Sequence, residues 1–274
     1  MTKILLTDWT FYPSVLIGFG LWTTAYVVVT GYRRIRSGWG KPPTHLQQAA
    51  FHVGTFIGLI ALISPLDKLG DEYLFSAHMT QHLLLMFIVP PLWLVGTPGW
   101  LIDLMIPVSL KKFARWITSP LPAFIVFTGE MLAWHTPFLY NLAQNNDAIH
   151  IFEHLTFIGA ALIGWWLVAA SESVLIPLPT PPVRMLYLFL LAIPMTALSA
   201  ILTFASAPLY SFYIEAPRLF GLSVLEDQRL GGLLMWVPAH MVLFLALGIT
   251  FHKWLVGEER QVDESLYANS LSRS

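Results

Sequence analysis

The sequence contains no cysteine, so it can form neither a disulfide nor a thiolate metal site. It is also poor in charge, because only 11% of its 274 residues are charged, whereas a typical soluble domain has about 25%. The formal net charge of −1 argues against a nucleic-acid partner, since such partners select a basic surface. Any bound metal must therefore use the nine histidines, the nine methionines or carboxylates.

What the sequence has instead is apolar length. Hydrophobic residues make up 56% of the chain, and seven runs approach the roughly 17–25 residues that a transmembrane helix needs. We predict an all-α polytopic membrane protein: a bundle of seven transmembrane helices over residues 1–256, followed by a polar cytoplasmic tail over residues 257–274. The predicted spans are Pro13–Tyr32, Leu46–Ser64, Leu74–Val95, Ser119–Trp134, Ile149–Ala170, Val183–Ser206 and Leu230–His252.

Basic residues are distributed unevenly between the loops. The first, third and fifth loops and the tail together carry eleven Lys and Arg, and the opposite side carries four: Lys3, Lys68, Arg218 and Arg229. Because cytoplasmic loops are enriched in Lys and Arg, this bias places the N-terminus outside and the tail in the cytoplasm. We expect the longest outer loop, residues 207–229, to fold over the outer mouth of the bundle.

Two histidine pairs lie at the predicted outer ends of spans. His78 and His82 are four residues apart, as are His150 and His154, and this spacing stacks two imidazoles on one face of a helix. Such residues inside a membrane are costly unless they bind or relay something. Imidazole suits copper, zinc, iron and nickel, and a thioether such as that of Met79 favours Cu(I). We therefore predict a metal site where the third and fifth spans meet.

Other polar residues fall on the same predicted side. His135 ends the fourth span, and Glu153 or Asp227 could fix the tautomer of a ligating imidazole. An ionisable residue within a span, such as Glu130, is a functional candidate by default. The predicted ligands are His78, His82, His150, His154, His135 and Met79, and the predicted supporting residues are Glu153, Asp227, Met235, His240, Asp71 and Glu130.

Isolated histidines and methionines have a simpler interpretation. A single histidine within a span is often a hydrogen-bonded packing residue, and we interpret His52, His240 and His252 first in this way. Methionine commonly fills irregular gaps in a core. We interpret four methionines as packing residues: Met86, Met105, Met195 and Met241.

A set of short motifs also runs through the chain in a fixed order. The motifs are Ser64-Pro-Leu-Asp67, Ser76-Ala-His-Met79, Gln81-His82, Pro90-Pro91, Gly96-Thr-Pro98, Trp134-His-Thr-Pro137, Leu139-Tyr140, His150 with Glu153-His154, and Asp227-Gln228 with Gly231, Met235 and Trp236. Over roughly residues 10–255, this set resembles the CtaG-type cytochrome c oxidase assembly proteins of Gram-positive and related bacteria. The resemblance implies a seven-span protein of the bacterial plasma membrane. It also implies a role in forming an active caa3-type haem–copper oxidase, through help in building its copper centre.

We therefore expect an assembly factor and not an enzyme. Copper would be captured from outside at the two histidine pairs, assisted by Met79, His135 or Met235, and passed laterally to a haem–copper oxidase subunit. Membrane lipids are the other expected partners, and the oligomeric state stays open. Three alternatives remain: a haem-binding protein with two axial histidines, a metal or proton transporter that uses Glu130, and a structural subunit of a respiratory complex without a ligand.

Overall fold

The computed structural model describes residues 7–271, with side chains described through residue 259. Within those residues the chain forms helices and turns and no strand. Six helical segments are long and apolar enough to cross a membrane. They are Pro13–Ser37 (α2, Pro13–Val28; η1, Val29–Arg33; α3, Arg34–Ser37), His45–Ile63 (α4), Phe75–Gly96 (α6, Phe75–Leu83; η2, Leu84–Ile88; α7, Val89–Gly96), Asp147–Ala169 (α12), Pro181–Phe204 (α13) and the helix α15, Val224–Leu271.

A seventh crossing is possible but bent. Val108–Ile117, which comprises η3 (Val108–Leu110) and α9 (Lys111–Ile117), meets α10 (Pro120–Trp134) at 72°. Pro120 and Pro122 begin α10, where a proline is tolerated because the first helical N–H groups lack partners. The predicted all-α bundle is confirmed, with six apolar helices or seven if this bent pair counts as one span.

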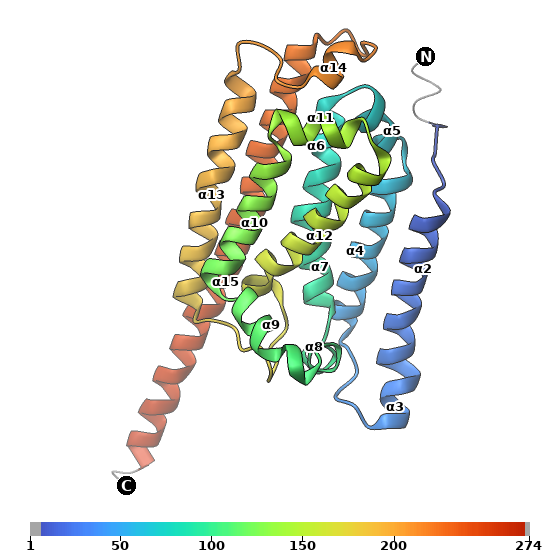
Figure 1. Ribbon diagram of the computed structural model, residues 1–274. Helices are drawn as coiled ribbons and strands as arrows, with labels where there is room; N and C mark the ends of the chain where they lie inside the picture. Colours follow the sequence, from blue (N-terminus) through green and yellow to red (C-terminus); the bar gives the residue numbers. More distant parts are fainter. Residues whose placement is uncertain (1–6, 272–274) are drawn as a thin grey trace.

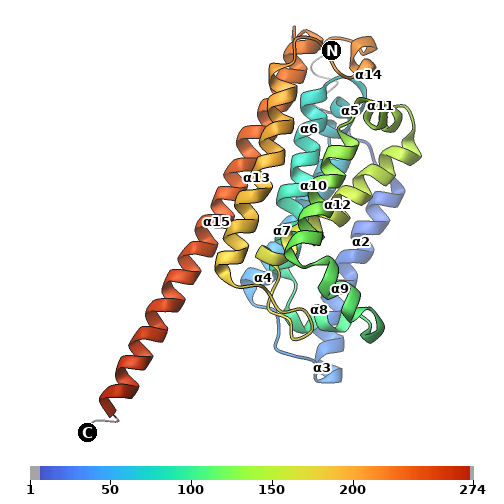
Figure 2. The ribbon, with the colours of Figure 1, turned by 60° about the vertical axis from the view of Figure 1, so that its left-hand side comes forward.

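The remaining helices are short and lie at the two ends of the bundle. Figures 1 and 2 show α5 (Pro65–Glu72), α11 (Pro137–Gln144) and α14 (Ser211–Glu215) at one end, and α8 (Gly99–Met105) with α9 at the other. In both views α13 and α15 stand side by side, and α12 crosses the bundle obliquely. The segment around α14 covers its end of the bundle and buries Tyr210 and Tyr213, in line with the expected outer-loop cover.

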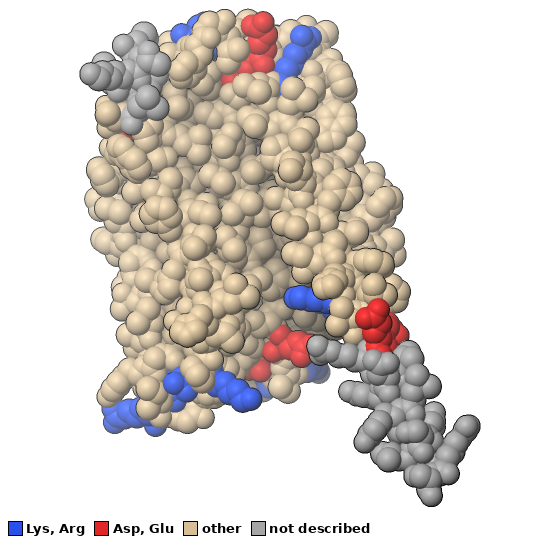
Figure 3. Space-filling view, turned by 180° about the vertical axis from the view of Figure 1, so that it is seen from behind, with Lys and Arg blue, Asp and Glu red and all other residues tan. Residues whose placement is uncertain are grey.

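On one face of the molecule, the charged side chains lie at the two ends (Figure 3). Figure 3 shows Lys, Arg, Asp and Glu above and below a broad apolar belt on the face that it displays. Large apolar residues are exposed on this belt, for example Leu21 on α2 and Met241 on α15. Such a surface is stable against lipid tails but not against water.

The third span contains one widened turn. Pro90 has no N–H, so the carbonyl of Met86 cannot receive its usual intrahelical hydrogen bond. The indole N–H of Trp165, on α12, donates to that carbonyl instead at 2.8 Å. The π-helical turn η2 contains Met86. The hydrogen bond from Trp165 satisfies the free carbonyl and links the third span to α12.

The chain ends differ from the prediction in detail only. Helix α15 continues beyond Gly257, the predicted start of the polar tail, as far as Leu271. Residues 272–274 of the predicted tail lie outside the described residues, as does Lys3.

Candidate metal centre

The N-terminus of α6, the helix that carries His78 and His82, is capped by a residue that is distant in the sequence. Leu74, at the start of α6, offers no capping side chain. The buried carboxylate of Asp227, on α15, accepts hydrogen bonds from the backbone N–H groups of Phe75 and Ser76 at 2.7 and 3.1 Å. A carboxylate at a helix N-terminus satisfies free donors and matches the helix dipole. Asp227 thus positions α6 through its backbone N–H groups.

The N-terminus of α12, the helix that carries His150 and His154, is capped by the residue that precedes it. The side chain of Asn146 accepts hydrogen bonds from the N–H groups of Ala148 and Ile149 at 3.0 and 3.1 Å. This cap starts α12 at Asp147, so His150 and His154 fall in its first two turns.

These two helices bring the four histidines together. The ring centroids are 4.1 Å apart for His78 and His82, and 4.4 Å apart for His150 and His154. Between the helices, His78 lies 5.3 Å from His150, and His82 lies 5.3 Å from His154. One ring nitrogen from each of the four lies within 4.8 Å of the others. We refer to these four residues as the histidine cluster.

Several nitrogens of the histidine cluster lack partners. Among residues 7–271, no hydrogen bond is made by either ring nitrogen of His82 or by Nε2 of His150 and His154. A buried polar atom without a partner costs about 1–3 kcal/mol. Several unpaired nitrogens that lie close together form a set that could share one cation, because each neutral imidazole offers one lone pair.

Two carboxylates flank the cluster. Asp71, on α5, places Oδ1 3.7 Å from Nδ1 of His78 and 3.7 Å from Nε2 of His150. Burial raises the pKa of Asp71 to about 6, although His150 acts in the opposite direction. Glu153, on α12, lies with Oε1 4.0 Å from Nε2 of His82, and neither of its oxygens has a hydrogen-bond partner in the described part of the chain. Both carboxylates can balance positive charge bound between the imidazoles.

A polar and aromatic cover closes the site at the α11 end. Gln144, the last residue of α11, is hydrogen-bonded to Nδ1 of His78 at 3.1 Å. The ring of Tyr140 packs 5.5 Å from that of His78, and its hydroxyl pairs with that of Tyr213 at 3.1 Å. Gly70 permits the close approach of α5, because a Cβ there would lie 2.9 Å from Cα of His78.

Met79 and Met235 line a cavity of about 20 Å³ deeper in the bundle, and His82 and His135 belong to the same lining. The rings of His82 and His135 are 6.3 Å apart. The predicted ligands thus divide between two places, and His82 borders both.

The other predicted supporting residues lie outside both places. Glu130 accepts a hydrogen bond from the hydroxyl of Thr156 at 2.8 Å. His240 bonds to Thr196 at 2.8 Å and to the carbonyl of Trp236 at 2.6 Å, as a packing histidine would.

The sequence interpretation assigned no role to three residues that shape the site. Gln144 carried no signal, because an isolated glutamine at the end of a short helix has no characteristic spacing. Tyr140 stood in a noted motif, but no role was assigned to it. Met131 lines the deep cavity from α10 and could have been found only by its depth relative to Met79.

Comparison with known proteins gives one family. The family model described as cytochrome c oxidase caa3 assembly factor matches residues 24–256. An uncharacterized protein of Mycobacterium leprae is 23% identical over 296 aligned positions, which cover 94% of this chain and 43% of the relative. Uncharacterized proteins of Mycobacterium bovis and Mycobacterium tuberculosis are each 22% identical, over 68% of this chain and 31% of the relative. The chain thus spans less than half the length of these relatives, and no solved structure matches it.

Proposed function

The chain belongs to the caa3-type cytochrome c oxidase assembly factor family, and from this premise we propose that it captures a copper ion at the histidine cluster for delivery to a haem–copper oxidase. The observation that carries the proposal is the convergence of four imidazoles whose ligand atoms lie within 4.8 Å of one another. In this proposal the cluster binds and transfers copper and catalyses no reaction.

The four imidazoles of the histidine cluster are suitable ligands for a copper ion that is bound and then released. Imidazole nitrogens bind copper, zinc, nickel and iron, and the first-row affinity order peaks at copper. A tetrahedral ion with nitrogens at about 2.0 Å holds its ligand atoms roughly 3.3 Å apart, so the rings would move inward by about 1.5 Å at most. Rotations about the side-chain torsions of His78 and His150 supply movements of that size. The ligating form of the side chain is the neutral imidazole.

The size of the adjoining space favours an ion over haem. The cavity next to His82 has a volume of about 20 Å³, whereas pockets for organic ligands typically measure about 300–1,000 Å³. Two facing histidines could otherwise serve as axial ligands to haem iron. An optical spectrum therefore separates the two candidates.

We place the histidine cluster on the outer side of the bacterial plasma membrane. The cluster lies at the end of the bundle with α5, α11 and α14, and the opposite end carries Arg33, Lys111 and most other basic residues. Since basic loops are retained in the cytoplasm, this arrangement supports copper entry from the extracytoplasmic space. The apolar belt would allow lateral contact with oxidase subunits within the bilayer.

Metal analysis of the purified protein tests the proposal. The wild-type protein, loaded with copper and freed of excess, should retain copper at the cluster, and His78→Ala/His82→Ala should lose it. A matched control is His45→Ala/His252→Ala, since both of these histidines are exposed and lie elsewhere. Unchanged copper content in the His78/His82 variant would contradict the proposal, and a Soret band in the wild type would favour haem.

A further inference from the structure

The cavity below the histidine cluster is lined by methionines from four spans. Five of the nine methionines in the chain border it. All five are buried, with exposed fractions between 0 and 7%. They are Met79 on α6, Met86 in η2, Met131 on α10, Met195 on α13 and Met235 on α15. We refer to this space as the methionine cavity.

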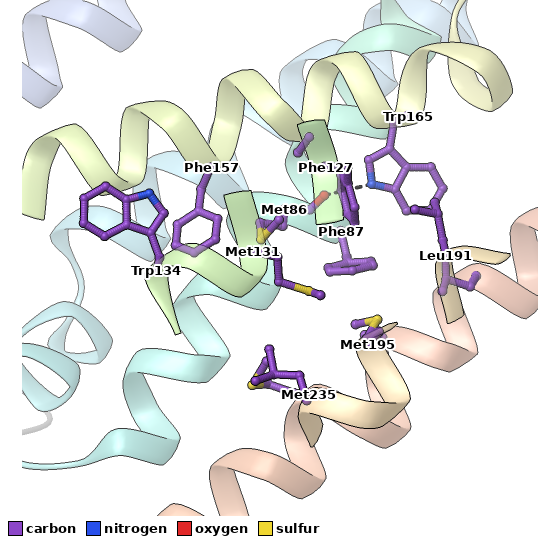
Figure 4. Close-up of a cluster of buried hydrophobic side chains, with 14 of the residues drawn as sticks. Met86, Phe87, Phe127, Met131, Trp134, Phe157, Trp165, Leu191, Met195 and Met235 are labelled. Atoms are coloured by element: carbon purple, nitrogen blue, oxygen red, sulfur yellow. Dashed lines mark hydrogen bonds between the residues drawn. The ribbon is translucent and has the colours of Figure 1, made fainter. Parts of the chain in front are cut away.

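Figure 4 shows how these side chains lie. Met131, Met195 and Met235 extend from three different helices toward a common space, with Met86 on its far side. A methionine that only fills a gap closes it with its own side chain. Here about 20 Å³ stays open between the five side chains, which is slightly more than one water-sized sphere occupies.

The polar atoms that line the methionine cavity offer lone pairs. Nδ1 of His135 lies 2.6 Å from the carbonyl of Met131, and since a carbonyl only accepts, Nδ1 carries the proton. Nε2 of His135 therefore holds a lone pair, is buried, and has no hydrogen-bond partner among the described residues. Thioether sulfurs are weak acceptors and never donors. The cavity consequently presents sulfur and nitrogen lone pairs, which a cation can satisfy and an apolar side chain cannot.

From these observations we propose that the methionine cavity is a second, soft-metal site, which binds Cu(I) through thioether sulfurs and Nε2 of His135. Thioether ligands select Cu(I) over harder ions. The claim that this site binds Cu(I) stands by itself. The claim that it receives copper from the histidine cluster rests on the proposed function.

His82 makes the two sites contiguous. Its ring lies 5.3 Å from that of His154 in the histidine cluster and borders the methionine cavity on its other side. Both of its ring nitrogens lack partners in the described chain. An ion can therefore exchange imidazole ligands for thioether ligands around His82 with no change in oxidation state.

X-ray absorption at the copper edge gives a direct test on the full-length protein. Wild-type protein loaded with Cu(I) under a reductant should show sulfur scatterers bound to copper. Because the chain has no cysteine, any such sulfur belongs to methionine. Absence of sulfur scattering in the wild type would overturn the proposal without recourse to any variant.

A variant series then locates the sulfur. Met131→Leu/Met195→Leu/Met235→Leu keeps side-chain volume and apolarity and should lose the sulfur signal and one equivalent of Cu(I), measured against a competing chelator. The control Met105→Leu/Met241→Leu changes two methionines that are 55% and 66% exposed and should lose neither. Equal loss in both variants, or none in the triple variant, would reduce the five methionines to packing residues.

A third variant separates this proposal from the first. His150→Ala/His154→Ala removes half of the histidine cluster and leaves the methionine cavity intact. The sulfur signal should persist in this variant even if copper uptake at the cluster fails. If copper content falls only in the triple methionine variant, the histidine cluster is refuted and the methionine cavity is supported.

Discussion

Two histidines inside this bundle illustrate opposite uses of the same side chain. His240, between α13 and α15, donates from Nδ1 to the carbonyl of Trp236, and Nε2 pairs with Thr196. His82, between α6 and α12, makes no hydrogen bond to any described residue from either ring nitrogen. The first is satisfied by the fold itself, whereas the second keeps two buried nitrogens that a ligand could engage. Substitutions at the two histidines should therefore have different effects.

The largest effect is expected from Asp227, which lies on the same helix as His240 but serves the His82 region. Asp227→Ala leaves the N–H groups of Phe75 and Ser76 unpaired, at about 1–3 kcal/mol each. We expect a loss of roughly 2–6 kcal/mol in the free energy of unfolding, measured by denaturation in detergent. The exposed Glu215→Ala should change it by less than about 0.5 kcal/mol. Equal stability of the two variants would mean that Asp227 does not hold α6.

Copper should stabilise one region and not the other. At a free concentration 100 times Kd, a bound ion stabilises a fold by about 2.7 kcal/mol. We expect wild-type protein and His240→Leu to gain this increment in thermal unfolding from each occupied site, and His82→Leu to gain less, because the histidine cluster loses a ligand. A copper-dependent shift of equal size in His82→Leu would remove His82 from the site.

Close packing around the site should be intolerant of one added methyl group. Gly70→Ala would place a Cβ 2.9 Å from Cα of His78, and overpacking of this kind costs about 1–3 kcal/mol. Gly18→Ala, on α2, meets nothing within 4 Å and should gain about 0.5–1 kcal/mol as a helix position. Opposite signs in a thermal unfolding assay would confirm that α5 and α6 are in tight contact.

The smallest effect should appear without copper. His240→Leu leaves Thr196 without its imidazole partner and should lose about 1 kcal/mol. His82→Leu removes two unpaired nitrogens and should leave the metal-free protein as stable as the wild type, or more so. Thermal unfolding in the presence of a chelator measures both. A greater loss in His82→Leu would show that His82 has a structural partner.

Much of the fold followed from the sequence for one physical reason. A span is set by the length and apolarity of a local run, so α4, α12 and α13 lie within a few residues of their predicted bounds. The predicted fourth span, Ser119–Trp134, corresponds to α10, which meets the segment Val108–Ile117 at a sharp bend. The order of loops with many and few basic residues gave the expected orientation, which is still a prediction.

The candidate site could be predicted only in part. The four-residue spacing of His78 and His82 and of His150 and His154 reports helix geometry, and these histidines do converge. Their convergence depends on the oblique course of α12, which no local pattern encodes. Met79 follows His78 about 100° round the helix, and it lines the cavity that His82 also borders. Asp227 reaches α6 from about 150 residues away, a distance that sequence spacing cannot register.

The widened turn η2 also fixes the rotational phase between the two halves of the third span. Above it lie His78 and His82, and below it Trp93 donates to the hydroxyl of Thr55 at 3.0 Å. The widened turn holds one residue more than a regular α-helical turn, and it absorbs that residue locally. Deleting one residue from a regular turn of the third span would rotate everything below it by about 100° and move Trp93 away from α4, whereas deleting one from Leu84–Ile88 would close the widened turn and keep the phase. The third span therefore carries an extra residue without turning its anchored end away from the orientation that the histidine end requires.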